Sequence, residues 1–251
     1  MEFAHVSILA PECMEILRPE RGGVYVDCTA GGGGHSFEIA RRLPEGGRLI
    51  CLDRDDAALA ACEKRLAPFA DRVTLVKTNF SGIGAALDSL GIDQIHGVMW
   101  DLGVSSYQLD EKGRGFSYTA EAPLDMRMDQ SAAFCAKDVV NGYSEAELIR
   151  IIRDYGEEKF AARVARIICE RRAEKPIETT SELADIVYQA IPAAARHKEN
   201  QHPARRTFQA IRIEVNGELD SIPPSLEEAI RRLAPGGRAA VITFHSLEDR
   251  I

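Results

Sequence analysis

The sequence contains no apolar run that approaches the roughly 18 residues needed to cross a membrane, and no basic N-terminal segment followed by an apolar core. It also contains no Cys-x-x-Cys pair among its six cysteines. Cys28 and Cys51 fall in apolar runs typical of buried strands. We therefore expect reduced core thiols, no metal site, no association with a membrane and a cytoplasmic location.

Positive charge is also scarce, because the formal net charge is -8 and the isoelectric point is about 5.4. This balance excludes a protein held to nucleic acid mainly by its overall basicity, so any such contact must come from a local patch. The length of 251 residues and the 45% of apolar residues suit a globular protein with one large domain or a domain with an insertion.

Short apolar runs alternate with helical patterns from residue 24 onward, which is typical of a parallel sheet covered by helices. We expect strands at 24–28, 48–52, 72–77, 95–102 and 238–244, and helical connections at 36–43, 57–66 and 83–90. The alternation stops for more than a hundred residues between the fourth and fifth strands.

The interruption has helical patterns only. Ser144 and Thr179 each precede a glutamate by three residues, which predicts capped helix starts. Ser225 is expected to cap a further helix through Leu233, ended by Pro-Gly-Gly at 235–237. The sequence therefore predicts an α/β fold, with a Rossmann-like sheet domain at 1–110 and 215–251 and a helical insertion at 111–214.

A glycine run follows the first expected strand, from Gly31 to Gly34. The dinucleotide fingerprint Gly-x-Gly-x-x-Gly/Ala does not fit this run cleanly. If the fingerprint starts at Gly31, its last position holds Ser36, and if it starts at Gly32, that position holds Phe37. An acidic residue four positions before the first glycine, here Asp27, is instead the arrangement of S-adenosylmethionine sites.

Polar residues also follow the next strands. Asp53 is placed to accept hydrogen bonds from the ribose hydroxyls of an adenosyl group, a contact that S-adenosylmethionine and NAD would both make. The alternative is that Asp53 caps the next helix, a role for which Asp55 is the stronger candidate. Phe80 is placed beside an adenine or in the core. Asp101 is placed for the amino group of a cofactor or for a reacting base.

Several longer motifs match one family in order along the chain. They are His5-Val6-Ser7, Gly33-Gly34-His35-Ser36, Leu52-Asp53-Arg54-Asp55, Asp101-Leu102-Gly103-Val104-Ser105-Ser106, Gln108-Leu109-Asp110, Arg114-Gly115-Phe116-Ser117, Pro123-Leu124-Asp125-Met126-Arg127-Met128-Asp129, Tyr155-Gly156-Glu157-Glu158, His202-Pro203-Ala204, Arg206-Thr207-Phe208-Gln209-Ala210 and Phe244-His245-Ser246-Leu247-Glu248-Asp249-Arg250. On these residues the chain resembles the bacterial small-subunit ribosomal RNA cytosine-N4 methyltransferases, the RsmH/MraW family.

The resemblance implies S-adenosylmethionine as cofactor and a cytosine in the decoding region of small-subunit ribosomal RNA as substrate, methylated on its exocyclic N4. It implies a helical insertion that helps to bind the RNA. It also implies cofactor contacts from Gly33, Gly34, His35, Asp53, Phe80, Asp101 and Gln108.

The chain departs from the family in two places. Tyr107 stands where the family commonly has proline. The chain also ends at Ile251, whereas family members continue past this point and complete the sheet. We therefore expect the C-terminal strands of the sheet to be missing, and the fifth strand to lie at an edge.

Methylation of an amine requires alignment with the methyl group and an acceptor for a proton. Asp101 is the first candidate for that acceptor. Ser105, Ser106 and His245 are weaker candidates for orienting the base, and His245 is equally suited to local bonding at a strand end. No covalent cysteine adduct is needed.

A basic patch lies between residues 196 and 212, where five positive charges stand against one negative charge. The charges are those of Arg196, Lys198, Arg205, Arg206 and Arg212, against Glu199. We expect Arg205, Arg206 and Phe208, which lies among these five positive charges, to contact substrate RNA, with a solvated helix face as the alternative.

Two other functions stay open on the sequence alone. One is a DNA amino-methyltransferase, although such enzymes normally carry an [Asp/Asn/Ser]-Pro-Pro-[Tyr/Phe/Trp] tetrapeptide where this chain has Asp101-Leu102-Gly103-Val104. The other is a noncatalytic RNA-binding or assembly factor that retains the methyltransferase fold.

Overall fold

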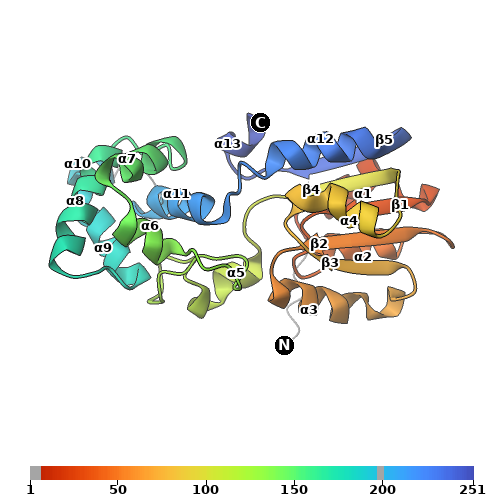
Figure 1. The fold of residues 1–251 in the computed structure, drawn as a ribbon, viewed down its shortest axis with the longest axis horizontal. Helices are drawn as coiled ribbons and strands as arrows, with labels where there is room; N and C mark the ends of the chain where they lie inside the picture. The colour runs from red at the N-terminus through yellow and green to blue at the C-terminus, as the bar shows by residue number, and fades with distance from the viewer. Residues whose placement is uncertain (1–6, 197–200) are drawn as a thin grey trace. The chain divides into compact units, whose positions relative to one another are not determined.

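The computed structural model describes residues 7–196 and 201–251. They form two compact units, which we call the sheet unit (Met1–Ser105 with Leu219–Ile251) and the helical unit (Ser106–Glu218). Figure 1 shows the strands gathered in the first and helices alone in the second. We describe each unit by itself.

The sheet unit contains five parallel strands in the order β3-β2-β1-β4-β5. Their bounds are Val24–Asp27 for β1, Arg48–Asp53 for β2, Val73–Lys77 for β3, Ile95–Asp101 for β4 and Leu233–Ile242 for β5. This arrangement confirms the predicted α/β, Rossmann-like fold. Its order changes direction beside β1, where the carboxyl ends of β1 and β4 meet.

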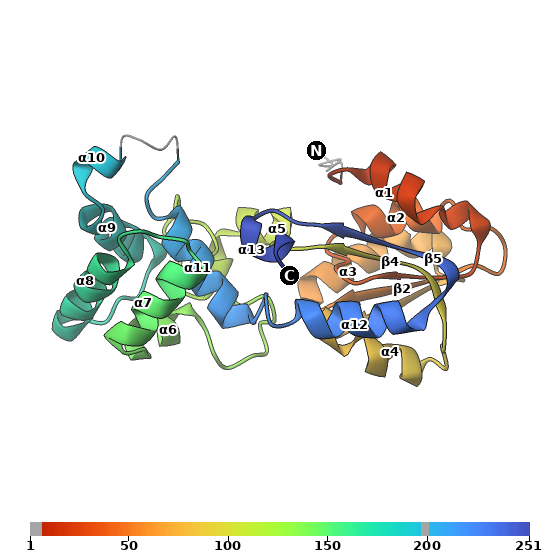
Figure 2. The ribbon, with the colours of Figure 1, turned by 90° about the horizontal axis from the view of Figure 1, so that it is seen from above.

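Helices cover both faces of the sheet, which explains why the strands consist of nearly continuous apolar residues. On one face a buried cluster includes residues of α1 (Ala10–Leu17), α2 (Gly34–Ala40) and α3 (Asp56–Leu66). On the other a second cluster includes residues of α4 (Ile83–Ser89) and α12 (Ile222–Arg232). In Figure 2, α1 and α2 lie on one side of the strands and α4 and α12 on the other.

The expected cap of the chain's last long helix at Ser225 is wrong, and the helix ends at Arg232, before the Pro-Gly-Gly segment that was expected to end it. Helix α12 begins at Ile222 and has prolines in its first turn, where the missing N–H of proline costs no hydrogen bond within the helix. Ser225 therefore lies inside the helix, and its hydroxyl accepts a hydrogen bond of 2.9 Å from the indole of Trp100. Leu233 already belongs to β5, which continues through Pro235-Gly236-Gly237.

The helical unit consists of helices connected by loops, as predicted. They are α5 (Ser106–Asp110), α6 (Ala136–Gly142), α7 (Glu145–Asp154), α8 (Ala161–Glu174), α9 (Thr180–Ala190), α10 (Ala193–Arg196) and α11 (Arg205–Asn216). The predicted capping boxes at Ser144 and Thr179 are confirmed, since each side chain accepts the N–H of the glutamate three residues later. Outside residues 197–200, the unit has no strand, only an isolated bridge between Pro123 and Thr179.

Shorter elements complete the chain. They are the 3-10 helices Pro19–Arg21, Ala67–Phe69, Phe80–Gly82 and Lys112–Arg114, and α13 (Ser246–Asp249) after β5.

The six cysteines are all free thiols, and Cys28 and Cys51 are buried in the core as predicted. Among the residues that the structure describes, no group of three or more His, Cys, Asp or Glu side chains is arranged to hold a metal ion. None of the helices in the same residues is both long enough and apolar enough to cross a membrane.

Candidate functional site

The glycine loop, residues 28–33, connects the carboxyl end of β1 to the start of α2. Asp27, the last residue of β1, is 1% exposed and holds this loop through hydrogen bonds to its carboxylate. One of its carboxylate oxygens accepts the N–H of Thr29 at 3.1 Å, and the other accepts the hydroxyl of Ser36 at 2.6 Å. Burial raises the pKa of Asp27, although the bond from Ser36 opposes this shift. Asp27 thus shapes the loop.

Two glycines of the loop have backbone conformations that favour glycine. Gly31 has φ +49° and Gly33 has φ +77°. A Cβ atom at Gly33 would lie 3.2 Å from both the Cα and the Sγ of Cys62, so the loop packs directly on α3. A Cβ atom at Gly32 would meet nothing within 4 Å. The loop is therefore supported on one side and open for a ligand at Gly32.

Asp53 ends β2 and is hydrogen-bonded to the glycine loop. Its carboxylate accepts the N–H of Gly31 at 2.8 Å and the N–H of Asp55 at 2.9 Å. Burial raises the pKa of Asp53 to about 6, although both N–H groups lower it. Asp55, whose side chain accepts the N–H of Ala57, is the residue that caps α3. The capping alternative is therefore correct for Asp55 and wrong for Asp53.

Asp101 ends β4 beside the same loop. Its backbone N–H donates a hydrogen bond of 2.6 Å to the hydroxyl of Thr29, a contact that no sequence pattern indicated. Its carboxylate is 28% exposed and lies 3.6 Å from Nε2 of His35, which is within ion-pair range but long for a hydrogen bond. The Oδ1 atom of Asp101 is buried and accepts no hydrogen bond from the described residues.

His35 lies in the first turn of α2 and is 5% exposed. Burial lowers its pKa, but Asp101 and then Asp27 raise it by more, so that the net shift is upward. The structure thus brings together three of the predicted cofactor residues, Asp53, Asp101 and His35, around one loop.

Phe80 begins a 3-10 helix after β3 and packs, partly buried, against the core cluster that includes α4. The neighbouring Asn79 is fixed in place, since its side chain accepts the N–H of Ser81 and donates to the hydroxyl of Ser221 at 3.0 Å. This packing fits the core alternative for Phe80, and its contact with an adenine stays a prediction.

The segment after β4 crosses from one unit to the other. Ser105 is the last residue of the sheet unit, and its Cβ would lie 3.9 Å from a Cβ atom at Gly31. Ser106 and Gln108 belong to α5 in the helical unit, where Gln108 is 5% exposed. Ser105 is thus next to the glycine loop, while the roles of Ser106 and Gln108 stay predictions.

His245 precedes α13 and is bonded locally. Its Nε2 lies 3.3 Å from a carboxylate oxygen of the buried Glu248. The other oxygen of Glu248 accepts the N–H of Phe244 at 2.7 Å. This geometry favours the local alternative for His245, and Glu248 is a structural partner that the sequence did not single out.

The geometry fits S-adenosylmethionine on three grounds. The glycine loop allows close approach of a ligand to its backbone. The oxygens of Asp53 keep lone pairs that can accept hydrogen bonds from ribose hydroxyls. The buried Oδ1 of Asp101 accepts no hydrogen bond from the described residues, which leaves it open to an amino group, either of the cofactor or of the reacting base.

In the helical unit, the predicted RNA residues separate into two kinds. Phe208 is 3% exposed and packs edge-on against Tyr118 with ring centroids 5.6 Å apart, so the prediction that it contacts RNA is corrected. Arg212 forms two hydrogen bonds, of 2.8 and 2.9 Å, with the carboxylate of Glu218. Lys198 and Glu199 lie outside the described residues.

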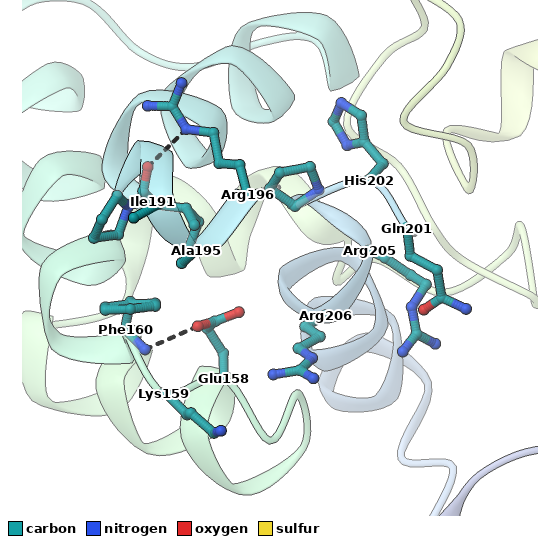
Figure 3. Close-up of a pocket in the computed structure, with 13 residues that line it drawn as sticks. Glu158, Lys159, Phe160, Ile191, Ala195, Arg196, Gln201, His202, Arg205 and Arg206 are labelled. Atoms are coloured by element: carbon teal, nitrogen blue, oxygen red, sulfur yellow. Dashed lines mark hydrogen bonds between the residues drawn. The ribbon is translucent and has the colours of Figure 1, made fainter. Parts of the chain in front are cut away.

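Arg205 and Arg206 line a pocket of about 500 Å³ within the helical unit. Figure 3 shows side chains converging on it from the loop before α8, from α10 and from the start of α11. The charged members of the lining are Lys159, Arg196, Arg205, Arg206 and Glu158. Four positive charges against one make this pocket basic within an acidic protein.

Known proteins resemble the chain along its whole length. A model of the MraW methylase family matches residues 2–251. The ribosomal RNA small subunit methyltransferase H of Symbiobacterium thermophilum is 56% identical over 251 residues, which cover 100% of this chain and 79% of that protein. The protein of the same name from Brevibacillus brevis is 55% identical, over 100% of this chain and 80% of that protein.

Among solved structures, the O-methyltransferase TomG from Streptomyces achromogenes, in complex with SAM, is 23% identical, with a TM-score of 0.35 over 39% of this chain and 46% of that chain. The family model spans residues 2–251, and both relatives are identical to this chain at more than half of the aligned positions. The chain therefore belongs to the MraW methylase family.

Proposed function

We propose that this protein methylates the exocyclic N4 of a cytosine in the decoding region of small-subunit ribosomal RNA, with S-adenosylmethionine as cofactor. The relatives named as small-subunit ribosomal RNA methyltransferases support the RNA substrate. The observation that carries the chemistry is the carboxylate of Asp101, which lies at the carboxyl end of β4 beside the glycine loop and has one oxygen that no donor among the described residues reaches.

The exocyclic amine of cytosine is a poor nucleophile, because its lone pair is delocalised into the ring. Bound S-adenosylmethionine supplies an electrophilic methyl group. The protein must then align the amine and accept its proton as the new C–N bond forms and the methyl–sulfur bond breaks, with the electron pair of that bond left on sulfur as a neutral thioether. Asp101 is our candidate for the acceptor, and Ser105 and Ser106 for orienting the base.

The cofactor would be held by the residues at the carboxyl edge of the sheet. Gly33, Gly34 and His35 offer the backbone at the start of α2, Asp53 offers acceptors for ribose hydroxyls, and Phe80 offers a ring for adenine. Gln108 completes the set that the family resemblance implies. We assign His245 to the support of α13, given its contact with Glu248.

The RNA strand would be held in part by the basic pocket of the helical unit. Arg205 and Arg206 are partly exposed at its wall, at the start of α11. Arg206 also donates to the carbonyl of Glu157 at 3.3 Å, which restricts its position. Phosphate groups are the anions that such a cluster would attract on an RNA strand whose target base is unstacked.

The test is methyl transfer by the full-length protein from tritiated S-adenosylmethionine to small ribosomal subunits that lack the modification. Digestion to nucleosides and mass spectrometry should show the label in N4-methylcytidine. Label in another nucleoside would contradict the N4 assignment, and preferential labelling of DNA would indicate a DNA amino-methyltransferase. Cofactor binding without any transfer would indicate a noncatalytic RNA-binding factor. With ribosomal RNA as substrate, we expect the protein to act in the cytoplasm.

A further inference from the structure

His35 is a buried histidine whose two ring nitrogens have no hydrogen-bond partner among the described residues. Burying a polar ring in this way is unfavourable unless a nearby charge or a ligand compensates. The charged groups around the ring therefore decide what state it adopts and what it does.

One of these groups, Asp27 on β1, is already committed. Both of its oxygens accept hydrogen bonds inside the loop, from Thr29 and from Ser36. The charge of Asp27 raises the pKa of His35, but the hydrogen bonds of its carboxylate stabilise the glycine loop.

The remaining groups on the packed elements are also engaged or neutral. Glu38, on the same helix, pairs with Arg41 and Arg42. Cys13 on α1 stays a thiol at neutral pH, since burial, followed by Asp101, raises its pKa to about 11. Arg65 on α3 donates to a carbonyl of the glycine loop.

Asp101 on β4 is left as the partner for the ring. Its Oδ2 lies 3.6 Å from Nε2 of His35, and in the described residues no other cation lies within ion-pair distance of it. The hydroxyl of Thr29 holds the backbone N–H of Asp101, and within the described part of the chain His35 is the one cationic side chain that reaches its carboxylate. We propose that His35 is a positioning residue, whose ring holds Oδ2 of Asp101 in place, with Oδ1 left for the N–H of a ligand.

This role rests on the proposed function, in which Asp101 takes the proton of the cytosine amine. In that step an N–H bond breaks, its electron pair stays on nitrogen, and the proton forms an O–H bond with Asp101. The contact with His35 holds this carboxylate in position for that transfer. His35 acts through Asp101 and touches neither substrate nor methyl group.

The pairing is tested without cofactor or substrate by following the imidazole resonances of the full-length protein by NMR as the pH is changed. In the Asp101→Asn variant, the pKa of His35 should fall by about one unit or more, because a carboxylate within a few ångströms is lost. His96, exposed on the same strand, serves as an internal control whose titration should not move. An unchanged titration of His35 would overturn the pairing.

A second variant tests the consequence for catalysis. In His35→Gln, kcat should fall by about tenfold or more while the KM for S-adenosylmethionine changes little, because the Asp101 carboxylate loses the ring that holds it in place. A ring with only a structural role would change kcat and KM together. The matched control is His96→Gln, which should leave both constants unchanged.

The two measurements separate the possible failures. If the titration of His35 depends on Asp101 but no cytosine is methylated, the proposed function is wrong and the pairing stands. If cytosine is methylated and His35→Gln keeps the kcat of the unmodified protein, the positioning role is wrong.

Discussion

The carboxylate of Asp53 accepts the backbone N–H of Gly31 at 2.8 Å, a bond that joins the end of β2 to the glycine loop across 22 residues of sequence. The same carboxylate therefore shapes the loop and retains acceptor capacity toward a ligand. A residue with both tasks should be sensitive to substitution in cofactor binding.

We expect Asp53→Ala to weaken the binding of S-adenosylmethionine by about 10- to 100-fold, since hydrogen bonds to a charged group contribute roughly 1.5–3 kcal/mol. Isothermal titration calorimetry measures this change. The control is Asp56→Ala, which removes a nearby exposed carboxylate paired with Lys77 and should leave affinity unchanged. Equal losses in both variants would point to general electrostatics in place of a specific contact.

Cofactor affinity should depend on pH through Asp53. Burial raises the pKa of Asp53 to about 6, so the carboxylate becomes neutral as the pH falls through that value. If the ionised form accepts the ribose hydroxyls, the dissociation constant should be nearly flat above pH 7 and about tenfold higher at pH 5. Calorimetry at several pH values should show this rise in the unmodified protein and a smaller one in Asp53→Ala.

The close packing of the glycine loop on α3 gives a stability prediction. Gly33→Ala should destabilise the protein by about 2 kcal/mol or more, through the strain of φ +77° and a Cβ atom 3.2 Å from Cys62. Gly46→Ala is the matched control, because Gly46 has φ +80° and a Cβ atom there would meet nothing within 4 Å. The free energy of unfolding, measured by urea denaturation, should fall by only about 1 kcal/mol in Gly46→Ala, which has the backbone strain alone. Equal losses of unfolding free energy in the two variants would rule out the packing argument.

The strands and the capped helices were predictable from sequence because their signals are local. Four of the five strands lie within a residue or two of their expected ends. The fifth strand begins five residues before the expected start, as the Pro-Gly-Gly segment from Pro235 suggested a break. β5 lies at the edge of the sheet, where a proline that cannot donate a hydrogen bond is tolerated.

The site was predictable only in part, because its geometry depends on contacts between distant residues. The sequence placed Asp53, Asp101 and His35 at strand and helix ends, but nothing in it indicated that the hydroxyl of Thr29 accepts the N–H of Asp101. Nor did it indicate that Asp27 serves the loop through Ser36. Such pairings appear once the order of the strands is known.

Phe208 shows a different error. Its place among arginines suggested contact with RNA, yet it shares one face of α11 with Ile211 and packs in the core of the helical unit. The helical period of these apolar residues is a signal for burial, and it competes with the signal of local charge. Here the period was the better guide.

Arg205 and Arg206 should contribute to RNA binding mainly through charge. We expect each alanine variant to weaken the binding of a small-subunit RNA fragment and to reduce the slope of log affinity against log salt by about 0.7–0.9, the contribution of one neutralised phosphate. Arg166→Ala removes an exposed arginine that faces Glu170 on α8 and is the matched control. Fluorescence anisotropy between low and moderate salt gives the slopes. If Arg166→Ala lowers the slope as much as Arg205→Ala does, the effect belongs to net charge, and the pocket has no particular role in holding the strand.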